Sequence, residues 1–227
     1  MGAEPTLSVI VPVRNEADCL PALIADLRAQ HRPPDEILVV DGGSTDGTPE
    51  LAARLADGLI ESPPGRARQM NRGARVASGS VLWFLHADSR LPPDATLSLL
   101  TALGERAWGR FDVRLSGRHP AFRLIERMMN LRSCLTGICT GDQGLFIRRA
   151  AFEAVDGYPE LPLMEDIELS RALKRTVGRP VCLRTALVTS SRRWERRGIL
   201  RTVLLMWWLR LAWWLGVPAT RLAAWYR

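Results

Sequence analysis

The chain has 227 residues, of which 47% are apolar and 24% charged, as is typical of one globular domain with a sizeable core. The formal net charge is +7, and because Lys174 is the only lysine, arginine carries nearly all of the positive charge. Arginine binds phosphates through a planar, bidentate group, so this balance favours a diphosphate ligand or an anionic lipid surface, although arginine as a general solubilising cation also explains it. The arginines are spread along the chain and form no clustered basic face, which argues against a nucleic-acid partner.

The cysteines and the first apolar segment bear on the compartment. The four cysteines have neither zinc-finger spacing nor the density of a disulfide scaffold, so we expect free thiols in a reducing compartment. The apolar segment that begins at Leu7 is short and ends at Pro12 and Arg14 rather than at a small-residue cleavage site. It is predicted to be a strand instead of a signal peptide, and we therefore expect a cytoplasmic protein.

Two apolar runs, 7–11 and 37–40, are compact and closed by polar or glycine-containing segments, a pattern typical of buried parallel strands. Between them, leucine and isoleucine recur at helical spacing over 20–27. Asn15 precedes this segment and is expected to cap the helix. The order of elements is therefore strand, helix, strand.

The same order repeats further along the chain. Thr48 and Pro49 are typical of an N-cap and a first helical turn, and they open a helix that we predict through Leu55. The next predicted strand is 81–85, and a helical pattern over 92–103 follows it. Alternating units of this kind predict an α/β fold, with a mostly parallel sheet, helices on both faces and ligands at the carboxyl ends of the strands.

The second half of the chain is less regular. A strand is predicted over 111–115, a helix over 122–131 and a further helix from Glu165. Six of the eight tryptophans lie from Trp194 onward, so the end of the chain differs in composition from the predicted sheet.

Polar residues with ligand-binding chemistry follow the strongest predicted strands, where an open α/β sheet binds its ligand. Pro12, Asn15 and Glu16 follow the first strand. The segment 41–48 follows the second strand; its glycines allow backbone amides to approach a ligand, and the Asp41 carboxylate can accept hydrogen bonds from a base or ribose. A turn closed by Asp and Gly explains the same residues without a ligand.

Asp88 comes directly after the predicted strand 81–85. A carboxylate at the tip of a buried strand can coordinate a hard divalent cation that bridges two phosphates, so we expect Mn²⁺ or Mg²⁺ as a cofactor here. His86 is either a second metal ligand or a hydrogen-bonded turn residue.

Together these segments resemble the GT-A glycosyltransferases of the large inverting family 2. The resemblance extends over residues 7–174 and rests on three motifs in order: Ser8-Val9-Ile10-Val11-Pro12 with Asn15-Glu16, Val40-Asp41-Gly42-Gly43-Ser44 with Asp46-Gly47-Thr48, and Leu85-His86-Ala87-Asp88. It implies a Rossmann-like sheet, a nucleotide-diphosphate sugar as the donor, and Asp88 at the metal and diphosphate. The residues that it implies near the nucleoside and donor are Pro12, Asn15, Glu16, Asp41, Gly43 and Ser44.

The resemblance also implies an acidic pair that holds the catalytic base, and the chain has Glu165-Asp166 at the start of a predicted helix. Two acids at a helix start are also favourable partners of the helix dipole. With the other motifs present, we assign Asp166 as the base and Glu165 as its catalytic neighbour. Asp142 and Gln143 lie in a segment like the family's acceptor-side loop and are expected to hold sugar or acceptor hydroxyls.

The chain departs from the family pattern at two positions. Many members have paired aspartates where this chain has Asp41-Gly42, and the usual Asp-x-Asp is here His86-Ala87-Asp88, so the ligand set of the metal differs.

Other residues supply further candidate contacts to the donor. Arg66, Gln69 and Asn71 lie in one segment with guanidinium and amide groups, and Arg193-Trp194 resembles an arginine–tryptophan segment that closes over the diphosphate in some relatives. A solvated basic face explains both segments without a ligand.

The expected reaction is a single displacement at the anomeric carbon. Asp166 removes a proton from an acceptor hydroxyl as that oxygen attacks with inversion, and the nucleoside diphosphate leaves with metal assistance. A sugar-phosphate nucleotidyltransferase is one alternative, but it normally has a glycine-rich, basic loop after the first strand, where this chain has Val13-Arg14-Asn15-Glu16. The other is a catalytically inactive module that recruits a partner to membranes, which would release no nucleoside diphosphate.

We expect a GT-A domain over residues 1–198 and an apolar, Trp-rich helical tail over residues 199–227. From 203 to 215 the tail is apolar except for Arg210, and a helix of this length spans only ~20 Å against a hydrocarbon core of ~30 Å. The tail is therefore predicted to lie peripherally on the inner face of the cell membrane, with its tryptophans at the headgroup boundary and with Arg201, Arg210 and Arg221 at anionic lipids.

A helix buried against the sheet or in a dimer is the alternative for the tail, since it is apolar on every side. Membrane contact would favour a lipid or another apolar molecule as the acceptor.

Overall fold

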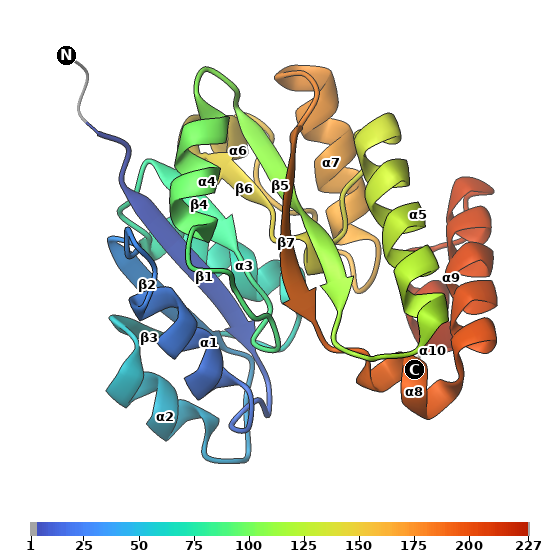
Figure 1. Cartoon of the computed structure of the whole chain (residues 1–227), viewed down its shortest axis with the longest axis horizontal. Helices are drawn as coiled ribbons and strands as arrows, with labels where there is room; N and C mark the ends of the chain where they lie inside the picture. The colour runs from blue at the N-terminus through green and yellow to red at the C-terminus, as the bar shows by residue number, and fades with distance from the viewer. Residues whose placement is uncertain (1–3, 227) are drawn as a thin grey trace.

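Seven strands form one sheet in the computed structural model, which describes residues 4–226 (Figure 1). The strands are β1 (Leu7–Val13), β2 (Glu36–Asp41), β3 (Gly58–Glu61), β4 (Val81–Phe84), β5 (Trp108–Leu115), β6 (Phe146–Arg148) and β7 (Val181–Thr189). Their order across the sheet is β3-β2-β1-β4-β6-β5-β7. Strand β6 is antiparallel to β4 and β5, and the other neighbouring pairs are parallel. The predicted mostly parallel sheet is confirmed.

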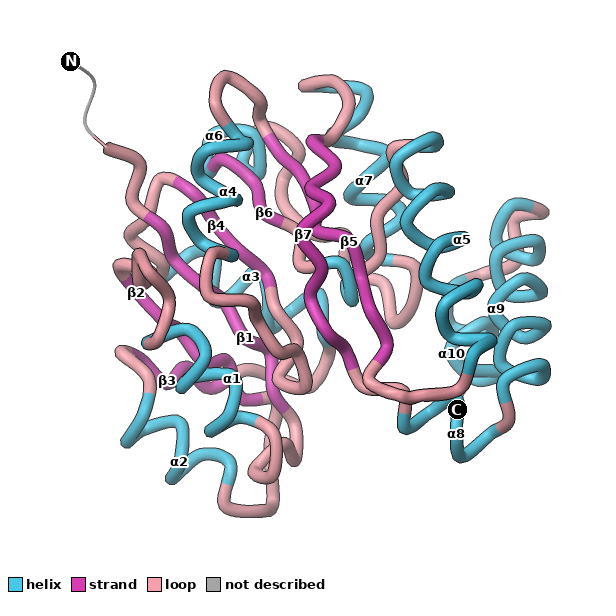
Figure 2. Tube along the Cα trace, viewed as in Figure 1, coloured by secondary structure: helices cyan, strands magenta, loops and turns pink. Residues whose placement is uncertain are grey.

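Helices cover both faces of this sheet, as Figure 2 shows. In the described part of the chain they are α1 (Leu20–Arg28), α2 (Thr48–Leu55), α3 (Arg66–Val76), α4 (Ala95–Leu103), α5 (Pro120–Thr136), α6 (Arg149–Glu153), α7 (Glu165–Thr176), α8 (Arg192–Arg197), α9 (Ile199–Trp214) and α10 (Ala219–Tyr226), with a short 3-10 turn, η1 (Gly141–Gln143).

The alternation of side chains along β1 explains the two layers of the core. Val9 and Val11 pack into an apolar cluster with α1, α2 and α4, whereas Ile10 packs into a second cluster with α3, α6 and α7. Gly73 lets α3 approach the sheet closely, because a Cβ at this position would be 2.5 Å from Cγ2 of Ile10. Both faces of β1 are therefore buried.

The position of β1 also determines where a ligand can bind. Strand β1 pairs with β2 on one side and with β4 on the other, so the order of the strands reverses at β1. The loops that follow β1, β2 and β4 meet at the carboxyl end of the sheet, where open α/β sheets bind ligands.

Two predicted helix boundaries differ from the structure. The prediction that Asn15 caps α1 is wrong, because that helix begins at Leu20 with Cys19 in the cap position. Helix α2 begins at Thr48, one residue earlier than an N-cap at Thr48 implies. Oδ1 of Asp46 accepts hydrogen bonds from the amide and the hydroxyl of Thr48 and so stabilises the start of this helix.

Helices α9 and α10 pack against the start of α7. Leu209 and Ala212 of α9 and Leu222 of α10 form an apolar cluster with Met164 and Ile167. Across residues 4–226, none of the helices combines the length and the apolar character needed to cross a membrane.

Candidate active site

The loops after β1 and β2 are joined by side-chain hydrogen bonds. The amide of Asn15 donates to Oγ of Ser44 at 2.9 Å, and the amide of Thr45 donates to Oδ1 of Asn15 at 2.8 Å. The amide of Glu16 donates to Oγ1 of Thr48, also at 2.9 Å. Asn15 has a φ of 56°, a left-handed conformation that asparagine adopts more readily than most residues. These contacts hold the two predicted donor-binding segments against each other.

Asp41 shapes the loop that follows it. Its carboxylate accepts hydrogen bonds from the amides of Gly43 and Ser44, each at 3.0 Å, and from the Ser44 hydroxyl. Gly43 has a φ of 81°, which explains a glycine here. The turn predicted at Asp41-Gly42 is thus present. A ligand could donate hydrogen bonds only to the carboxylate lone pairs of Asp41 that this turn leaves unused.

A pocket of about 540 Å³ lies beside this loop, a volume within the range of small-molecule sites. Asp41, Gly43 and Ser44 form one wall, and the others include Glu61, at the end of β3, and Arg72 of α3. The sequence prediction missed the last two residues. The signal for Glu61 is a carboxylate at the end of a strand, but β3 has only four residues and was not predicted; Arg72 lies in a helix with no comparable signal.

Two predicted donor contacts, Gln69 and Asn71, are instead structural. The Gln69 side chain is 5% exposed, and its Nε2 donates to the carbonyls of Val13 and Val40, both at 2.8 Å. Nδ2 of Asn71 donates to the Tyr158 carbonyl, and its Oδ1 accepts from the Tyr158 amide. Because both amides are used within the fold, Gln69 fixes α3 to β1 and β2, and Asn71 fixes it to the loop at Tyr158.

The acidic pair lies at the start of α7, after Met164 with a φ of 73°. Glu165 is only 6% exposed, and its Oε1 is 3.8 Å from Nη1 of Arg66. Oδ2 of Asp166 accepts a hydrogen bond from the amide of Gly141 at 2.9 Å, so the loop before β6 is held against this acid.

Burial makes both acids more basic than they are in water. It is the largest cause of the raised pKa of Asp166, which the Gly141 amide and the Arg66 guanidinium partly offset. Burial and then the charge of Asp166 raise the pKa of Glu165, and Arg66 again lowers it. A buried carboxylate with a raised pKa is better suited to accept a proton at neutral pH than an exposed one.

Asp142 and Gln143 have different roles in the loop before β6. Asp142 is partly exposed, and although burial raises its pKa, His86, Arg66 and Arg193 together lower it. Gln143 has no exposed surface; its Oε1 accepts from the Thr140 amide and its Nε2 donates to the Ser133 hydroxyl. The expectation that Gln143 contacts a substrate hydroxyl is therefore corrected, whereas Asp142 faces three cationic or ionisable side chains.

His86 has the contacts of a turn residue. Its Nδ1 is 3.3 Å from Oδ1 of Asp142. Its Nε2 is buried, makes no hydrogen bond to the described residues and lies where a Cβ on Gly141 would approach to 2.6 Å. The contact with Asp142 supports the turn role, and the role of His86 as a metal ligand stays a prediction.

Asp88 is the residue for which a metal-binding role is predicted. Among the described residues no donor binds its carboxylate, and its charge, after burial, is a cause of the raised pKa of Glu16 nearby. Within residues 4–226 there is no group of three or more His, Cys, Asp or Glu side chains that could hold a metal ion. Magnesium commonly binds through one or two carboxylates together with substrate phosphates and water, and Asp88 with Glu16 fits that donor set.

Arg193 and Trp194 lie on α8, both partly buried. The Arg193 guanidinium lies 3.9 Å above the ring of Tyr226 in α10. Burial lowers its pKa, as do the charges of Arg197 and Arg66, whereas Asp142 raises it. Residues far apart in the sequence therefore bring guanidinium groups together beside the acidic pair.

Arg210 of α9 is a residue of this site that was assigned another role. We expected it to meet anionic lipids, but it is partly buried and interacts electrostatically with Asp166. Burial lowers the pKa of Arg210, and the Asp166 carboxylate partly offsets this effect. The helix that was predicted as a tail thus carries a cation close enough to Asp166 for the two charges to interact.

Comparison with known proteins gives a family for this arrangement. The model of the glycosyl transferase family 2 matches residues 8–154, more than half of the chain. A PGL/p-HBAD biosynthesis glycosyltransferase of Mycobacterium bovis (strain BCG / Pasteur 1173P2) is 33% identical over 171 residues, which cover 69% of this chain and 64% of the relative. This chain therefore spans less than two thirds of the length of that relative.

Solved structures give the fold. The mannosyltransferase PcManGT from Pyrobaculum calidifontis, in complex with GDP-Man and Mn²⁺, matches with a TM-score of 0.70 and 24% identity over 92% of this chain and 61% of that one. TarS 1-349 of S. aureus in complex with UDP-GlcNAc matches with a TM-score of 0.67 and 19% identity over 82% of this chain and 58% of that one. The predicted GT-A fold is confirmed.

Proposed function

The chain belongs to glycosyl transferase family 2, and from this premise we propose that it transfers a sugar from a nucleotide-diphosphate sugar to an acceptor hydroxyl, with inversion at the anomeric carbon. The acidic pair Glu165-Asp166, of which Glu165 is buried and Asp166 is partly buried, carries the proposal. It lies between Arg66 and the loop at Gly141, next to the carboxyl end of the sheet.

The donor binds across the loops that follow β1 and β2. The pocket beside Asp41 and Gly43 has the volume and the mixed lining of a nucleoside site, and it opens next to residues that the family motifs implicate. The two solved relatives bind GDP-Man and UDP-GlcNAc, which supports a nucleotide sugar as the class of donor. Arg66 and Arg193 supply the guanidinium groups that suit a diphosphate.

Asp166 acts as the general base in this proposal. Its carboxylate accepts the proton of the acceptor hydroxyl as that oxygen attacks the anomeric carbon, and the bond from this carbon to the diphosphate breaks. The raised pKa of Asp166 strengthens it as a base, and the charge of Arg66 partly offsets that rise. A divalent cation held by Asp88, with Glu16 beside it, would offset the charge that develops on the leaving diphosphate.

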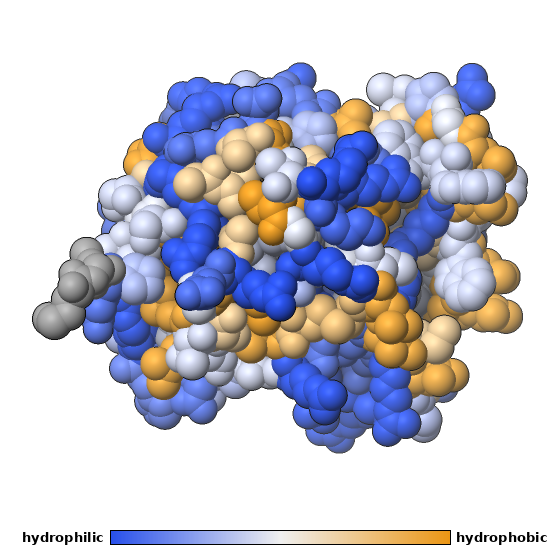
Figure 3. Space-filling view, turned by 90° about the horizontal axis from the view of Figure 1, so that it is seen from above, coloured by the Kyte–Doolittle hydropathy of each residue, from blue (hydrophilic) through white to orange (hydrophobic). Residues whose placement is uncertain are grey.

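Peripheral contact with a membrane is part of the proposal, and it rests on two exposed stripes. Helix α9 exposes Leu204, Trp207, Leu211 and Trp214, and α5 exposes Leu124, Met128, Leu131 and Leu135. We call these eight side chains the apolar face. Figure 1 shows α5 and α9 at the same end of the molecule, and Figure 3 shows orange and near-white side chains gathered at that end.

The charges around the apolar face favour an anionic bilayer. The only acid of α5, α9 and α10 is Glu126, which is buried and accepts a hydrogen bond from the Leu115 amide. The exposed arginines of the same helices are Arg127, Arg201 and Arg221, whereas Arg132 and Arg210 are partly buried and Arg123 pairs with Glu126. Apolar side chains bordered by cations are typical of helices that lie in the membrane interface, and a lipid acceptor follows from this location.

A screen of nucleotide sugars tests the proposed reaction. A bound donor raises the apparent melting temperature, by more the more tightly it binds, so we expect one class of nucleotide sugar to stabilise the protein, more so with Mn²⁺. The same donor should release nucleoside diphosphate on incubation. Release of pyrophosphate from a nucleoside triphosphate and a sugar phosphate would indicate a nucleotidyltransferase instead, and absence of any response would contradict the proposal.

A further inference from the structure

Two partly exposed arginines from different helices lie close together beside the acidic pair. They are Arg132 of α5 and Arg210 of α9, which we call the arginine pair. Burial is the largest cause of the lowered pKa of Arg132, which is about 10, and the charge of Arg210 is the next. A guanidinium group with this pKa is still protonated at neutral pH, so two positive charges are held close to each other.

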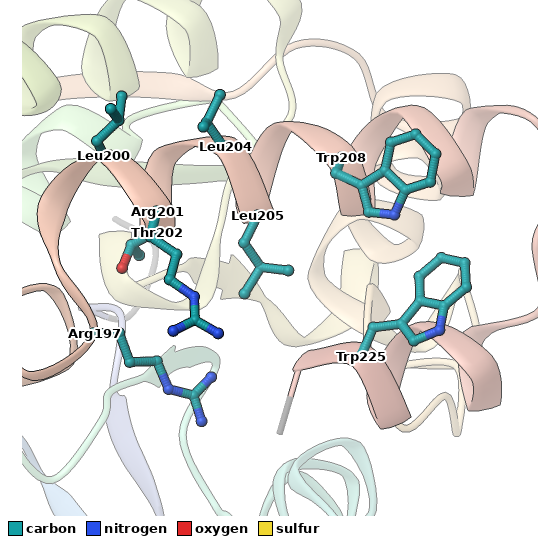
Figure 4. Close-up of a pocket in the computed structure, with 8 residues that line it drawn as sticks. All are labelled: Arg197, Leu200, Arg201, Thr202, Leu204, Leu205, Trp208 and Trp225. Carbon is teal, nitrogen blue, oxygen red and sulfur yellow. The ribbon is translucent and has the colours of Figure 1, made fainter.

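Arg210 lies on a different flank of α9 from the open groove of this helix. That groove, of about 700 Å³, is lined by Arg201, Leu205 and Trp208 (Figure 4). At about 3.6 residues per turn, Arg210 lies about 180° around the helix from Arg201 and about 160° from Trp208. The charge interaction with Asp166 shows that this flank of α9 is directed towards the start of α7.

Arg132 is fixed by the loop that also holds the candidate base. Its Nη1 donates to the Ile138 carbonyl at 3.3 Å. Three residues further on, the amide of Gly141 donates to Oδ2 of Asp166 at 2.9 Å. Ile138 also packs against the apolar cluster that contains Leu209, the neighbour of Arg210 in α9. The end of α5, the loop before β6, the start of α7 and α9 therefore converge beside Asp166.

The acids around the arginine pair do not neutralise it. Glu126, the only acid of α5, pairs with Arg123, and Glu168 of α7 pairs with Arg171. Asp166 is the carboxylate whose charge acts on both members of the arginine pair, and neither member forms a direct ion pair with an acid of the described residues. Two guanidinium groups that share one carboxylate retain a net positive charge, which favours an anionic ligand.

A separate group of arginines is available to the donor. Arg66 acts on Arg193 and on Asp166, and both of these arginines are assigned to the diphosphate in the proposed function. The arginine pair comes from other helices, α5 and α9. Asp166 thus interacts with two groups of cations, and the arginine pair is the group that the donor does not use.

We propose that the arginine pair binds a phosphate group of the acceptor and so places the acceptor hydroxyl at Asp166. The role of the hydroxyl rests on the proposed function, whereas the phosphate site does not. Guanidinium groups bind phosphate through planar, bidentate hydrogen bonds, and a bound phosphate offsets the repulsion between the two cations. A soluble phosphate ester and a phosphate-headed lipid share this chemistry.

Isothermal titration calorimetry with three probes tests the phosphate site and its source. Glycerol 3-phosphate has a phosphate and hydroxyls, glycerol has hydroxyls alone, and lauroyl lysophosphatidic acid, used below its micelle concentration, adds an acyl chain. Glycerol 3-phosphate should bind about 10-fold or more tightly than glycerol, because hydrogen bonds to charged groups are stronger than those between neutral groups. Equal affinities, or no binding of glycerol 3-phosphate, overturn the proposal. Tighter binding of lysophosphatidic acid than of glycerol 3-phosphate supports it with a lipid acceptor, and equal binding of these two supports it with a soluble one.

Substitutions locate the site. Arg132→Gln and Arg210→Gln should each weaken binding of glycerol 3-phosphate by about 10-fold or more. The controls Arg127→Gln on α5 and Arg201→Gln on α9 remove exposed arginines of the same helices and should leave it unchanged. Arg210→Lys keeps the charge without the planar fork and should retain part of the affinity, and thermal melting of each variant checks its fold. Unchanged binding in Arg132→Gln and Arg210→Gln, or an equal loss in the controls, overturns the proposal.

A competition titration separates the acceptor from the donor diphosphate. UDP or GDP, whichever stabilises the protein, is added to saturation before glycerol 3-phosphate is titrated. The affinity for glycerol 3-phosphate should be retained, since Arg66 and Arg193 are proposed to hold the diphosphate. Competition between the two ligands, or an equal loss of affinity for both in Arg210→Gln, would assign the arginine pair to the donor and overturn the proposal.

The same samples separate this inference from the proposed function. Wild-type protein that is stabilised by a nucleotide sugar but does not bind glycerol 3-phosphate overturns the acceptor site alone. Protein that binds glycerol 3-phosphate through the arginine pair but responds to no nucleotide sugar supports the phosphate site and contradicts the proposed donor.

Discussion

Nη1 of Arg66 lies 3.8 Å from Oε1 of Glu165, so a cation from α3 faces the acidic pair that opens α7. Arg66 lowers the pKa of Glu165 and also that of Asp166. Asp166 must be ionised to accept a proton, so kcat should fall as the pH drops through its raised pKa. Arg66→Gln should raise this pKa further and move the acid limb of the kcat profile to higher pH.

A pH–rate profile of wild type and Arg66→Gln measures this effect. The matched control is Arg68→Gln, which removes an exposed arginine of the same helix that binds Glu160 instead. Its acid limb should coincide with that of wild type. Coincident limbs for Arg66→Gln and wild type would show that Arg66 does not act on the base.

Asp166→Asn tests the base directly. This change removes the basic function and conserves the size of the side chain, so turnover should fall by roughly 10²-fold or more, the scale of general base catalysis. Donor affinity should change little. Donor titration and product formation are measured on the same variant, with Glu165→Gln beside it, for which we expect the smaller loss. An inactive Glu165→Gln together with an active Asp166→Asn would assign the base to Glu165.

Asp88→Ala tests the cation. Because this carboxylate is proposed to anchor the metal rather than the sugar, the loss of donor affinity should be greatest when Mn²⁺ or Mg²⁺ is present. His86→Ala should have the smaller effect, since the imidazole pairs with Asp142. Calorimetric titration of a nucleotide sugar with and without metal measures both. Equal donor affinity in Asp88→Ala and wild type at saturating metal would remove Asp88 from the site.

Glu165→Gln should stabilise the protein at neutral pH. The pKa of this acid is higher in the folded state than in the unfolded state, so folding favours its protonated form. Wild-type stability contributed by this group is present at low pH and is lost as the pH rises through the folded pKa. The neutral glutamine of the variant avoids that loss. The free energy of unfolding of Glu165→Gln at pH 8 should therefore exceed that of wild type by on the order of 1 kcal/mol, a common gain when a functional residue is replaced.

Denaturant unfolding of both proteins at pH 4 and pH 8 measures the difference in the free energy of unfolding. The two proteins should be closer in stability at pH 4 than at pH 8, because protonation neutralises Glu165 as the pH falls. A difference that is constant with pH would assign the gain to packing instead of to charge.

Much of the sheet could be predicted from the sequence, because β1, β2 and β4 are short apolar runs buried on both faces. Other elements have no such pattern. Strand β3 has four residues, and the segment of α3 is rich in arginine. Strand β7 contains an exposed Arg184, and its pairing with β5 shifts in register between Phe111 and Asp112. Their structure depends on contacts with distant strands rather than on local periodicity.

Part of the candidate site could likewise be predicted from local sequence, and part depends on contacts with distant residues. Acids that end a strand or begin a helix, such as Asp88 and Asp166, are recognisable from order and spacing alone. The amide of Gln143 resembles a ligand contact in the sequence, and its complete burial follows from packing against α5, through Ser133. Arg210 could not be assigned, because α9 is apolar on almost every side and no pattern tells which side faces Asp166.

The last prediction concerns the apolar face. Removal of the whole tail would uncover Met164 and Ile167, which precede and follow the acidic pair, so point substitutions are the better test. We expect Trp207→Ser with Trp214→Ser on α9 to weaken binding to phosphatidylglycerol-containing vesicles. Leu131→Ser with Leu135→Ser on α5 should have a similar effect, since exposed side chains of both helices are proposed to enter the interface.

Each double variant should lose about 10-fold or more in the vesicle-bound fraction measured by flotation, because burial of one large apolar side chain is worth ~1.5–3 kcal/mol. Leu97→Ser is the control; Leu97 is 48% exposed on α4, which packs on the sheet with α1 and α2. Binding should also weaken at high salt, since the arginines that border the face attract anionic lipids through a screened charge interaction. Loss of binding in the α9 variant alone would restrict the contact to the tail. Unchanged binding in both double variants would exclude this face as the site of membrane contact.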